Sequence, residues 1–431
     1  MTDWKWNALF RGDQETASYN ACVGNNGAPD IYYYADGYAD SVDLLIEGLT
    51  KGRGTLDTLI YPVCFNLRHA VELKIKGQIQ DLSRLSKVRK YPIAPDIEIE
   101  KVLNQHDIKN LWAFLSENAI ATDRRYREIF TASDALIGCI AETDPTGQTF
   151  RYSYSTEARK HLTDVSLINV LVLREQFRQL WMNLEKLSGL TDWLSQEYRS
   201  GTFTKNLSRE DLMAIARLLP LRSRWSDASE GLDAIRLSVK SVYSIGSAEL
   251  TEAIDKIQAC RDMARLIGIP VSLPGVSLGD LVALNDFWKL AWNRDALENE
   301  LRDDIFGREE VRMQPVVMSQ AIRREIQAKM DFAASIKNFR RWATVERLAG
   351  LQALMEIGSY DLCEEHDRRY AFHVKEMESL FSQSSQSCHE TADEIWSSTV
   401  GRAAYPSRVI DRLRRAGFHD EASSLAENLF S

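Results

Sequence analysis

The chain has 431 residues, 44% of them hydrophobic, which is enough for at least one large core. Its formal net charge of -9 provides no overall basic field to attract nucleic acid, although one face can still be basic. The N-terminus lacks the apolar stretch of a secretory signal, no run approaches the roughly 18 apolar residues of a membrane span, and the six cysteines show no CxxC spacing. We therefore expect a cytoplasmic protein with no membrane segment, cofactor or metal site.

Helical periodicity dominates the N-terminal half. Residues 1–35 are expected to form an irregular arm with a little extended structure, and helical spacing begins at Asp36. A longer helix is predicted from about 55 to 85, because its apolar residues fall on one stripe. These residues are Leu59, Val63, Leu67, Val71 and Ile75.

Three more helices are predicted at about 98–118, 121–140 and 166–198. Between the second and third, DPTG contains turn signals and FRYSYS alternates like a short strand. Ser208 and Asp211 then resemble a helix N-cap with an acidic first turn. Beyond them, helices are predicted at about 208–219, 229–245, 247–267, 277–304, 314–357, 360–382, 390–400 and 405–430.

The predicted fold class is all-α, with under about 10% strand, confined to residues 1–35 and 148–156. We expect an N-terminal arm (1–35), a helical bundle domain (36–204) and a larger helical C-terminal region (205–431). There is no P-loop, GxGxxG, HExxH, GxSxG or EF-hand motif in the sequence. The remaining function classes are a helical nuclease, a helical binding module and a scaffold.

The segment YPVCFNLRHAVELKIKGQI has an unusual density of polar groups for an apolar helix. Arg68, Glu72 and Lys76 are spaced i, i+4, i+8, and His69 lies three residues before Glu72. One interpretation is a ladder of ion pairs on a solvated face. The other is a working site, and the spacing alone leaves both open.

A second group lies at His106 and Asp107, where a helix can begin or bend. Asp107 is expected to cap that helix, while Trp112 enters the core. A hairpin could bring His106 against the helix that carries Arg68 and His69. Two imidazoles and a guanidinium in one crevice would suit metal-free RNA cleavage, with Arg151 as a further phosphate contact.

Several segments together resemble a known family. FNLRHAVELKIK, then QHDIKNLWAFL, then DPTGQTFRYSYS, with YADGYADSVDLLIEGL upstream, resemble bacterial HEPN-like proteins over about residues 33–200. The resemblance implies a helical bundle, often dimeric. Many such domains are metal-independent ribonucleases of toxin–antitoxin, CRISPR or anti-phage systems, and others are non-catalytic binding modules. Their usual active motif is Arg, four to six residues, then His, whereas Arg68 and His69 are adjacent here.

A conspicuous match to the Arg-x4-His spacing is Arg368 with His373. Residues five apart on a helix point about 140° away from each other, so the match is either accidental or completed across a dimer. A metal site from His366, Asp367 and His373 lacks convergent cysteine or carboxylate spacing.

The leading hypothesis is a prokaryotic defence or stress effector that acts on RNA, a metal-independent HEPN-type ribonuclease. Its expected catalytic residues are Arg68, His69, Glu72, His106, Arg368 and His373, and its expected RNA contacts are Lys76 and Arg151. A homodimer and a partner protein from the same operon are expected. The alternative is a non-catalytic sensor or adaptor that binds a partner protein or nucleotide in an anti-phage system. A dense patch of Arg and His favours the enzyme, whereas a large apolar groove without them favours the adaptor.

Overall fold

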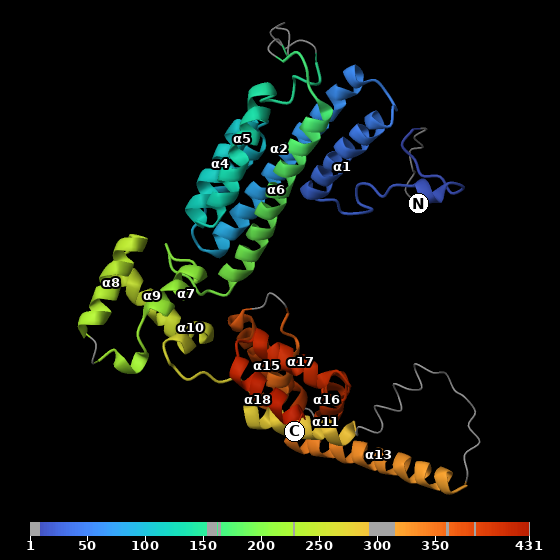
Figure 1. Ribbon diagram of the computed structural model, residues 1–431, viewed down its shortest axis with the longest axis vertical. Helices are drawn as coiled ribbons and strands as arrows, with labels where there is room; N and C mark the ends of the chain where they lie inside the picture. The colour runs from blue at the N-terminus through green and yellow to red at the C-terminus, as the bar shows by residue number, and fades with distance from the viewer. Residues whose placement is uncertain are drawn as a thin grey trace. The chain divides into compact units, whose positions relative to one another are not determined.

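The computed structural model describes residues 9–152, 162, 165–226, 229–292, 315–358, 362–382 and 385–430. Throughout these residues the regular structure is helical, which confirms the all-α prediction (Figure 1). The chain divides into two compact units, residues 1–199 and 200–431, and each is described by itself. No helix among the described residues is long and apolar enough to cross a membrane.

The first unit is a helical bundle built around one long helix. Its helices are α1 (Ile31–Thr50), α2 (Leu56–Val88), α3 (Asp96–Leu103), α4 (Ile108–Thr122), α5 (Tyr126–Thr143) and α6 (Val170–Arg199). α2 packs against α1, α4 and α6, and Figure 1 shows it running between α1 and the α4–α5 pair. The predicted stripe supplies its buried side, since Val63, Leu67, Val71 and Ile75 are all buried.

Two helix boundaries differ from the predictions because side chains cap the helices. α1 begins five residues before the expected Asp36, where the Asp30 side chain accepts a hydrogen bond from the Tyr33 backbone N–H. The helix expected at 98–118 is two helices, α3 and α4. The Asp107 side chain caps α4 as predicted, and Trp112 is buried.

The described residues contain no strand, which agrees with the predicted limit of about 10%. The extended structure expected within residues 1–35 and 148–156 is absent wherever those residues are described. Residues 9–30 hold one 3₁₀ turn, Ala17–Tyr19, and no strand. In the alternating FRYSYS segment, the backbone N–H groups of Arg151 and Tyr152 both bond to the Gln148 carbonyl, so the chain forms a turn there. The remaining residues of that predicted strand, 153–156, lie outside the described residues.

The second unit contains eleven α-helices among its described residues. They are α7 (Arg209–Leu218), α8 (Ser229–Tyr243), α9 (Ser247–Ala259), α10 (Arg261–Leu266), α11 (Leu278–Ala291), α13 (Pro315–Trp342), α14 (Val345–Met355), α15 (Cys363–Phe381), α16 (Ser385–Ser398), α17 (Tyr405–Arg415) and α18 (His419–Phe430). Ser208 and Asp211 form the predicted cap as a full capping box. The helices expected at 247–267, 314–357 and 405–430 are each two helices. The last of these breaks at Gly417, which has a positive φ.

Candidate functional site

Arg68 joins three of the four segments that carry the family resemblance. Its side chain is buried, and its guanidinium pairs with Glu72 one turn along α2. The same guanidinium donates to the backbone carbonyls of His106, Asp144 and Pro145, which lie 38 to 77 positions away. An arginine has five N–H donors, and the Arg68 guanidinium makes four hydrogen bonds to oxygen atoms of the protein. Arg68 therefore links α2 to two loops, and its charged group is buried among protein acceptors rather than open to a ligand. We call this set of hydrogen bonds from Arg68 the clasp.

The turn after α5 closes over this clasp. The Thr149 backbone N–H donates to the Asp144 side chain at 3.0 Å, and the Ile108 backbone N–H donates to the Pro145 carbonyl at 3.1 Å. Gly147, within the turn, has φ +80°, and a Cβ placed there would lie 3.1 Å from an Arg68 guanidinium nitrogen. Glycine is the residue that tolerates both the positive φ and the close approach.

Replacing Gly147 with alanine is expected to destabilise the first unit by about 1–3 kcal/mol, because alanine disfavours this backbone conformation and crowds Arg68. The matched control is Gly138→Ala. Gly138 lies within α5 with open space at its Cβ, so alanine should stabilise by about 0.5–1 kcal/mol. Denaturant unfolding of the full chain measures both. Equal stability of the two variants would rule out the tight turn.

Glu72 lies at the centre of the polar cluster and is also buried. Besides Arg68, it accepts hydrogen bonds at 2.8 Å from Lys76 Nζ and from His106 Nδ1. Burial opposes its ionisation, but the hydrogen bonds from Lys76, Arg68 and His106 outweigh that effect and hold the pKa of Glu72 below its usual range. An ionised carboxylate only accepts, so His106 donates through Nδ1 and its Nε2 remains for a ligand. The His106 side chain is 67% exposed.

His69 lies on a different strip of α2, in a stack of rings. Its imidazole meets the edge of Tyr38, with ring centroids 4.5 Å apart, and lies nearly parallel to Phe65 at 5.6 Å. The Arg151 guanidinium carbon lies over the Phe65 ring, 5.5 Å from the ring centroid. Burial lowers the pKa of His69, so this imidazole is neutral at pH 7. We use the name α2 face for five residues: Phe65 and His69 on α2, Tyr38 on α1, His106 before α4 and Arg151 after α5.

The structure brings together only part of the expected site. Glu72 and His106 are in contact, and Lys76 bonds to Glu72, with its side chain 10% exposed rather than free for RNA. Arg68 is adjacent but enclosed. Sequence spacing placed the three α2 residues correctly, whereas the roles of Phe65 and Tyr38 as neighbours of His69 were missed.

Arg368 and His373 do not converge within the chain. Arg368 is exposed on α15 and pairs with Glu365 at 2.6 Å. His373 is buried and bonds to Glu356 at 3.0 Å. The two side chains therefore have different neighbours, as expected for positions about 140° apart on one helix.

Side chains of the types that can bind a metal ion lie close together elsewhere in the second unit. Cys260, Asp262 and Cys363 bring their ligand atoms within 4.8 Å of one another, and they form the one such group among the described residues. His366 is buried beside Arg261 and Asp367 instead. Neither His366 nor His373 belongs to the group of Cys260, Asp262 and Cys363. No spacing in the sequence indicates the cysteine cluster, because its members are up to 103 positions apart.

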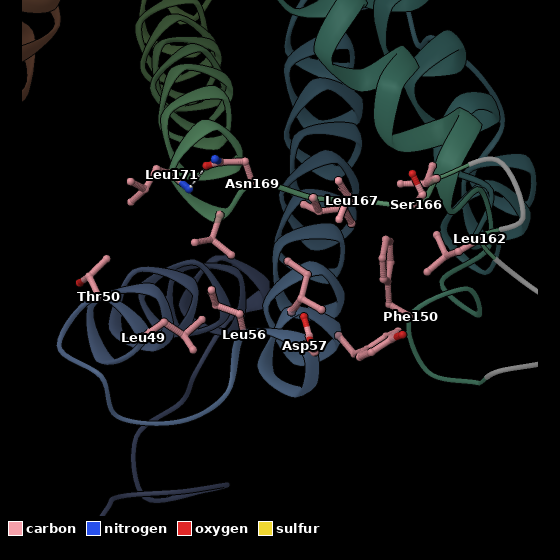
Figure 2. A pocket seen from close by; sticks show the side chains of 15 residues that line it. Leu49, Thr50, Leu56, Asp57, Phe150, Leu162, Ser166, Leu167, Asn169 and Leu171 are labelled. Atoms are coloured by element: carbon pink, nitrogen blue, oxygen red, sulfur yellow. Dashed lines mark hydrogen bonds between the residues drawn. The ribbon is translucent and has the colours of Figure 1, made fainter.

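A large cavity lies at one end of the first unit, where α1, α2 and the start of α6 meet Leu162 and residues 165–169 (Figure 2). Its volume is about 650 Å³. Among the described residues that line it there is no Arg, Lys or His, and most are apolar, including Leu49, Leu56, Phe150 and Leu167. This is the kind of groove that favours a binding module.

Comparison with known proteins adds no identification. No protein-family model matches the chain, and no curated protein or solved structure matches it significantly. The resemblance to HEPN-like proteins thus rests on the motif residues themselves. Three of those motifs meet at Arg68.

Proposed function

We propose that the first unit belongs to a prokaryotic defence or stress effector and cleaves RNA without a metal ion. The observation that carries the proposal is the α2 face. It combines stacked rings, an exposed arginine and an exposed histidine oriented by a buried carboxylate. Aromatic and guanidinium planes are the groups on which unpaired bases stack, and an arginine also attracts phosphate.

The chemistry needs one proton acceptor and one proton donor. The neutral imidazole of His69 takes the 2′-hydroxyl proton, and the 2′-oxygen attacks the adjacent phosphorus. The bond from phosphorus to the 5′-oxygen breaks, and His106 in its imidazolium form supplies the Nε2 proton to that leaving oxygen. The products are a 2′,3′-cyclic phosphate and a 5′-hydroxyl. Arg151 is the cation available to the phosphate, while Arg68 and Glu72 position His106.

The test is incubation of the purified full chain with end-labelled single-stranded RNA in excess EDTA. The proposal expects fragments to accumulate at a rate proportional to protein concentration. Cleavage that appears only after Mg²⁺ is added would contradict it. RNA that remains intact at stoichiometric protein would favour the second candidate below.

The second candidate is a non-catalytic adaptor, and two observations favour it. Arg68, the arginine of the motif, is enclosed by protein acceptors, and the 650 Å³ cavity is lined without basic side chains. Under this alternative the cavity takes an apolar segment of a partner protein. Leu167→Glu, at a residue 91% exposed on its wall, would then abolish activity in cells, whereas His106→Ala would leave it intact.

Replacing Arg151 with alanine is expected to weaken binding of single-stranded RNA without unfolding the protein, because Arg151 is exposed. Loss of one phosphate contact makes the negative slope of log affinity against log salt concentration shallower by about 0.7. Arg53→Ala is the matched control, since Arg53 is an exposed arginine in the α1–α2 loop. Fluorescence anisotropy at several salt concentrations measures both variants. Equal slopes for the two variants would remove Arg151 from the RNA-binding surface.

A further inference from the structure

Two cysteines in the second unit have their sulfurs in contact. Cys260 lies between α9 and α10, and Cys363 is the first residue of α15, 103 positions later. Their Sγ atoms are 3.7 Å apart, and both residues are buried, with 4% and 3% exposed. Both thiols are free as the structure stands. A sulfur pair held this close needs only a small approach to reach the roughly 2.05 Å of a disulfide bond.

A buried arginine spans the pair. Arg209, the first residue of α7, places one guanidinium nitrogen 3.5 Å from Cys260 Sγ and 3.7 Å from Cys363 Sγ. The same nitrogen lies 2.6 Å from an Asp262 carboxylate oxygen. A positive group therefore already occupies the position that a metal ion would need among these atoms. Its charge is shared with the carboxylates of Asp262 and Glu364, so it does not activate the sulfurs as thiolates.

We propose that Cys260 and Cys363 are a modification site, at which hydrogen peroxide converts the two thiols into a disulfide. One sulfur attacks the peroxide oxygen, the O–O bond breaks, and a sulfenic acid and one water form. The second sulfur then attacks the first, the S–S bond forms, and the sulfenic oxygen leaves as a second water. The two thiols lose two hydrogens and two electrons, and hydrogen peroxide is reduced to two waters.

The surroundings set the pH dependence of this oxidation. The hydrogen bond with Cys260, followed by burial and the nearby carboxylates of Glu364 and Asp262, raises the pKa of the Cys363 thiol well above its usual range. Less thiolate is then present at neutral pH, so oxidation should quicken as the pH rises. A thiol of low reactivity suits a pair that responds to sustained peroxide rather than to a brief pulse.

The disulfide would tie the α9–α10 junction to the start of α15 and close a covalent loop of about 100 residues. Closing so long a loop restricts the unfolded chain, so the oxidised second unit should melt roughly 10 °C higher than the reduced one. The bond is independent of the RNA site, since all its residues belong to residues 200–431.

The test uses the full chain treated with hydrogen peroxide across a range of pH, then alkylated, digested and analysed by mass spectrometry. We expect a linked pair of peptides that contain Cys260 and Cys363, two hydrogens lighter than the reduced pair and released by dithiothreitol. Cys260→Ser and Cys363→Ser should abolish the linked pair and the rise in melting temperature. Cys139→Ser, at an exposed cysteine, should retain both.

Three results would overturn the proposal. The two cysteines remain free while Cys22 or Cys139 is oxidised, or they reach sulfinic acid without a cross-link. In the third, the reduced chain binds one equivalent of Zn²⁺ that protects both thiols, which would identify a metal site instead. Because wild-type mapping alone decides among these outcomes, the test holds even if a serine variant fails to fold.

Discussion

The variant Arg68→Ala is expected to lose about 3–5 kcal/mol of stability in the first unit, the range seen when one partner of a buried ion pair is removed. The reason is specific to this side chain. Its loss leaves Glu72 with a buried negative charge short of one partner, and frees the backbone carbonyls of His106, Asp144 and Pro145 from their donor. For a unit of this size, the melting temperature should fall by roughly 10 °C.

Thermal unfolding of the full chain, followed by circular dichroism, measures this change. The matched control is Arg84→Ala, which removes an arginine from the same helix. Arg84 is 72% exposed and pairs with Asp81 at 2.6 Å, so its loss should cost under about 1 kcal/mol. Arg68→Lys should also destabilise, because an ammonium cannot reproduce the planar array of donors. Equal melting temperatures for Arg68→Ala and Arg84→Ala would show that Arg68 does not form the clasp.

Replacing His106 with alanine should lower the rate of RNA cleavage by about 10²- to 10⁴-fold, the usual contribution of a general acid or base. Stability should change by under about 0.5 kcal/mol, because the side chain is mostly exposed and Glu72 keeps Arg68 and Lys76 as partners. Single-turnover cleavage in EDTA, read beside the melting temperature, separates the two effects.

The matched control for this variant is His389→Ala, at an exposed histidine on α16 of the second unit. It should cleave RNA at the wild-type rate. If His106→Ala also keeps the wild-type rate while remaining folded, His106 is not catalytic. If the variant unfolds instead, the role of the imidazole is its structural hydrogen bond to Glu72, and the proposed catalytic role of the Glu72–His106 pair fails.

Local patterns predicted much of the fold. The apolar stripe from Val63 to Ile75 located the buried side of α2, and Asp107 was expected to cap a helix, as it does. What failed were the ends and breaks of helices. The early start of α1 at Ile31 depends on a single side-chain cap, and the turn at Gln148 overrode an alternating pattern. Periodicity cannot register either feature, because each depends on one or two hydrogen bonds.

The site was predictable where it lies on one helix and unpredictable where it depends on loops. Spacing alone placed Arg68, Glu72 and Lys76 together. The other acceptors of Arg68 are main-chain carbonyls of distant loops, and any residue type can supply a carbonyl. Sequence therefore identified a polar cluster but not which member was enclosed. The opposite error occurred at Arg368 and His373, where a motif spacing did not correspond to a shared site.

The most direct test of the proposed mechanism is the chemical identity of the RNA ends produced in EDTA by the wild-type chain and by His106→Ala. We expect 2′,3′-cyclic phosphate and 5′-hydroxyl ends from the wild type, because the 2′-oxygen attacks and no metal-bound water takes part. In the folded variant we expect these ends to be absent, or formed at a rate at least about 100-fold lower. RNA that stays intact with the wild-type chain, or ends that carry a 5′-phosphate and a 3′-hydroxyl, would contradict the mechanism.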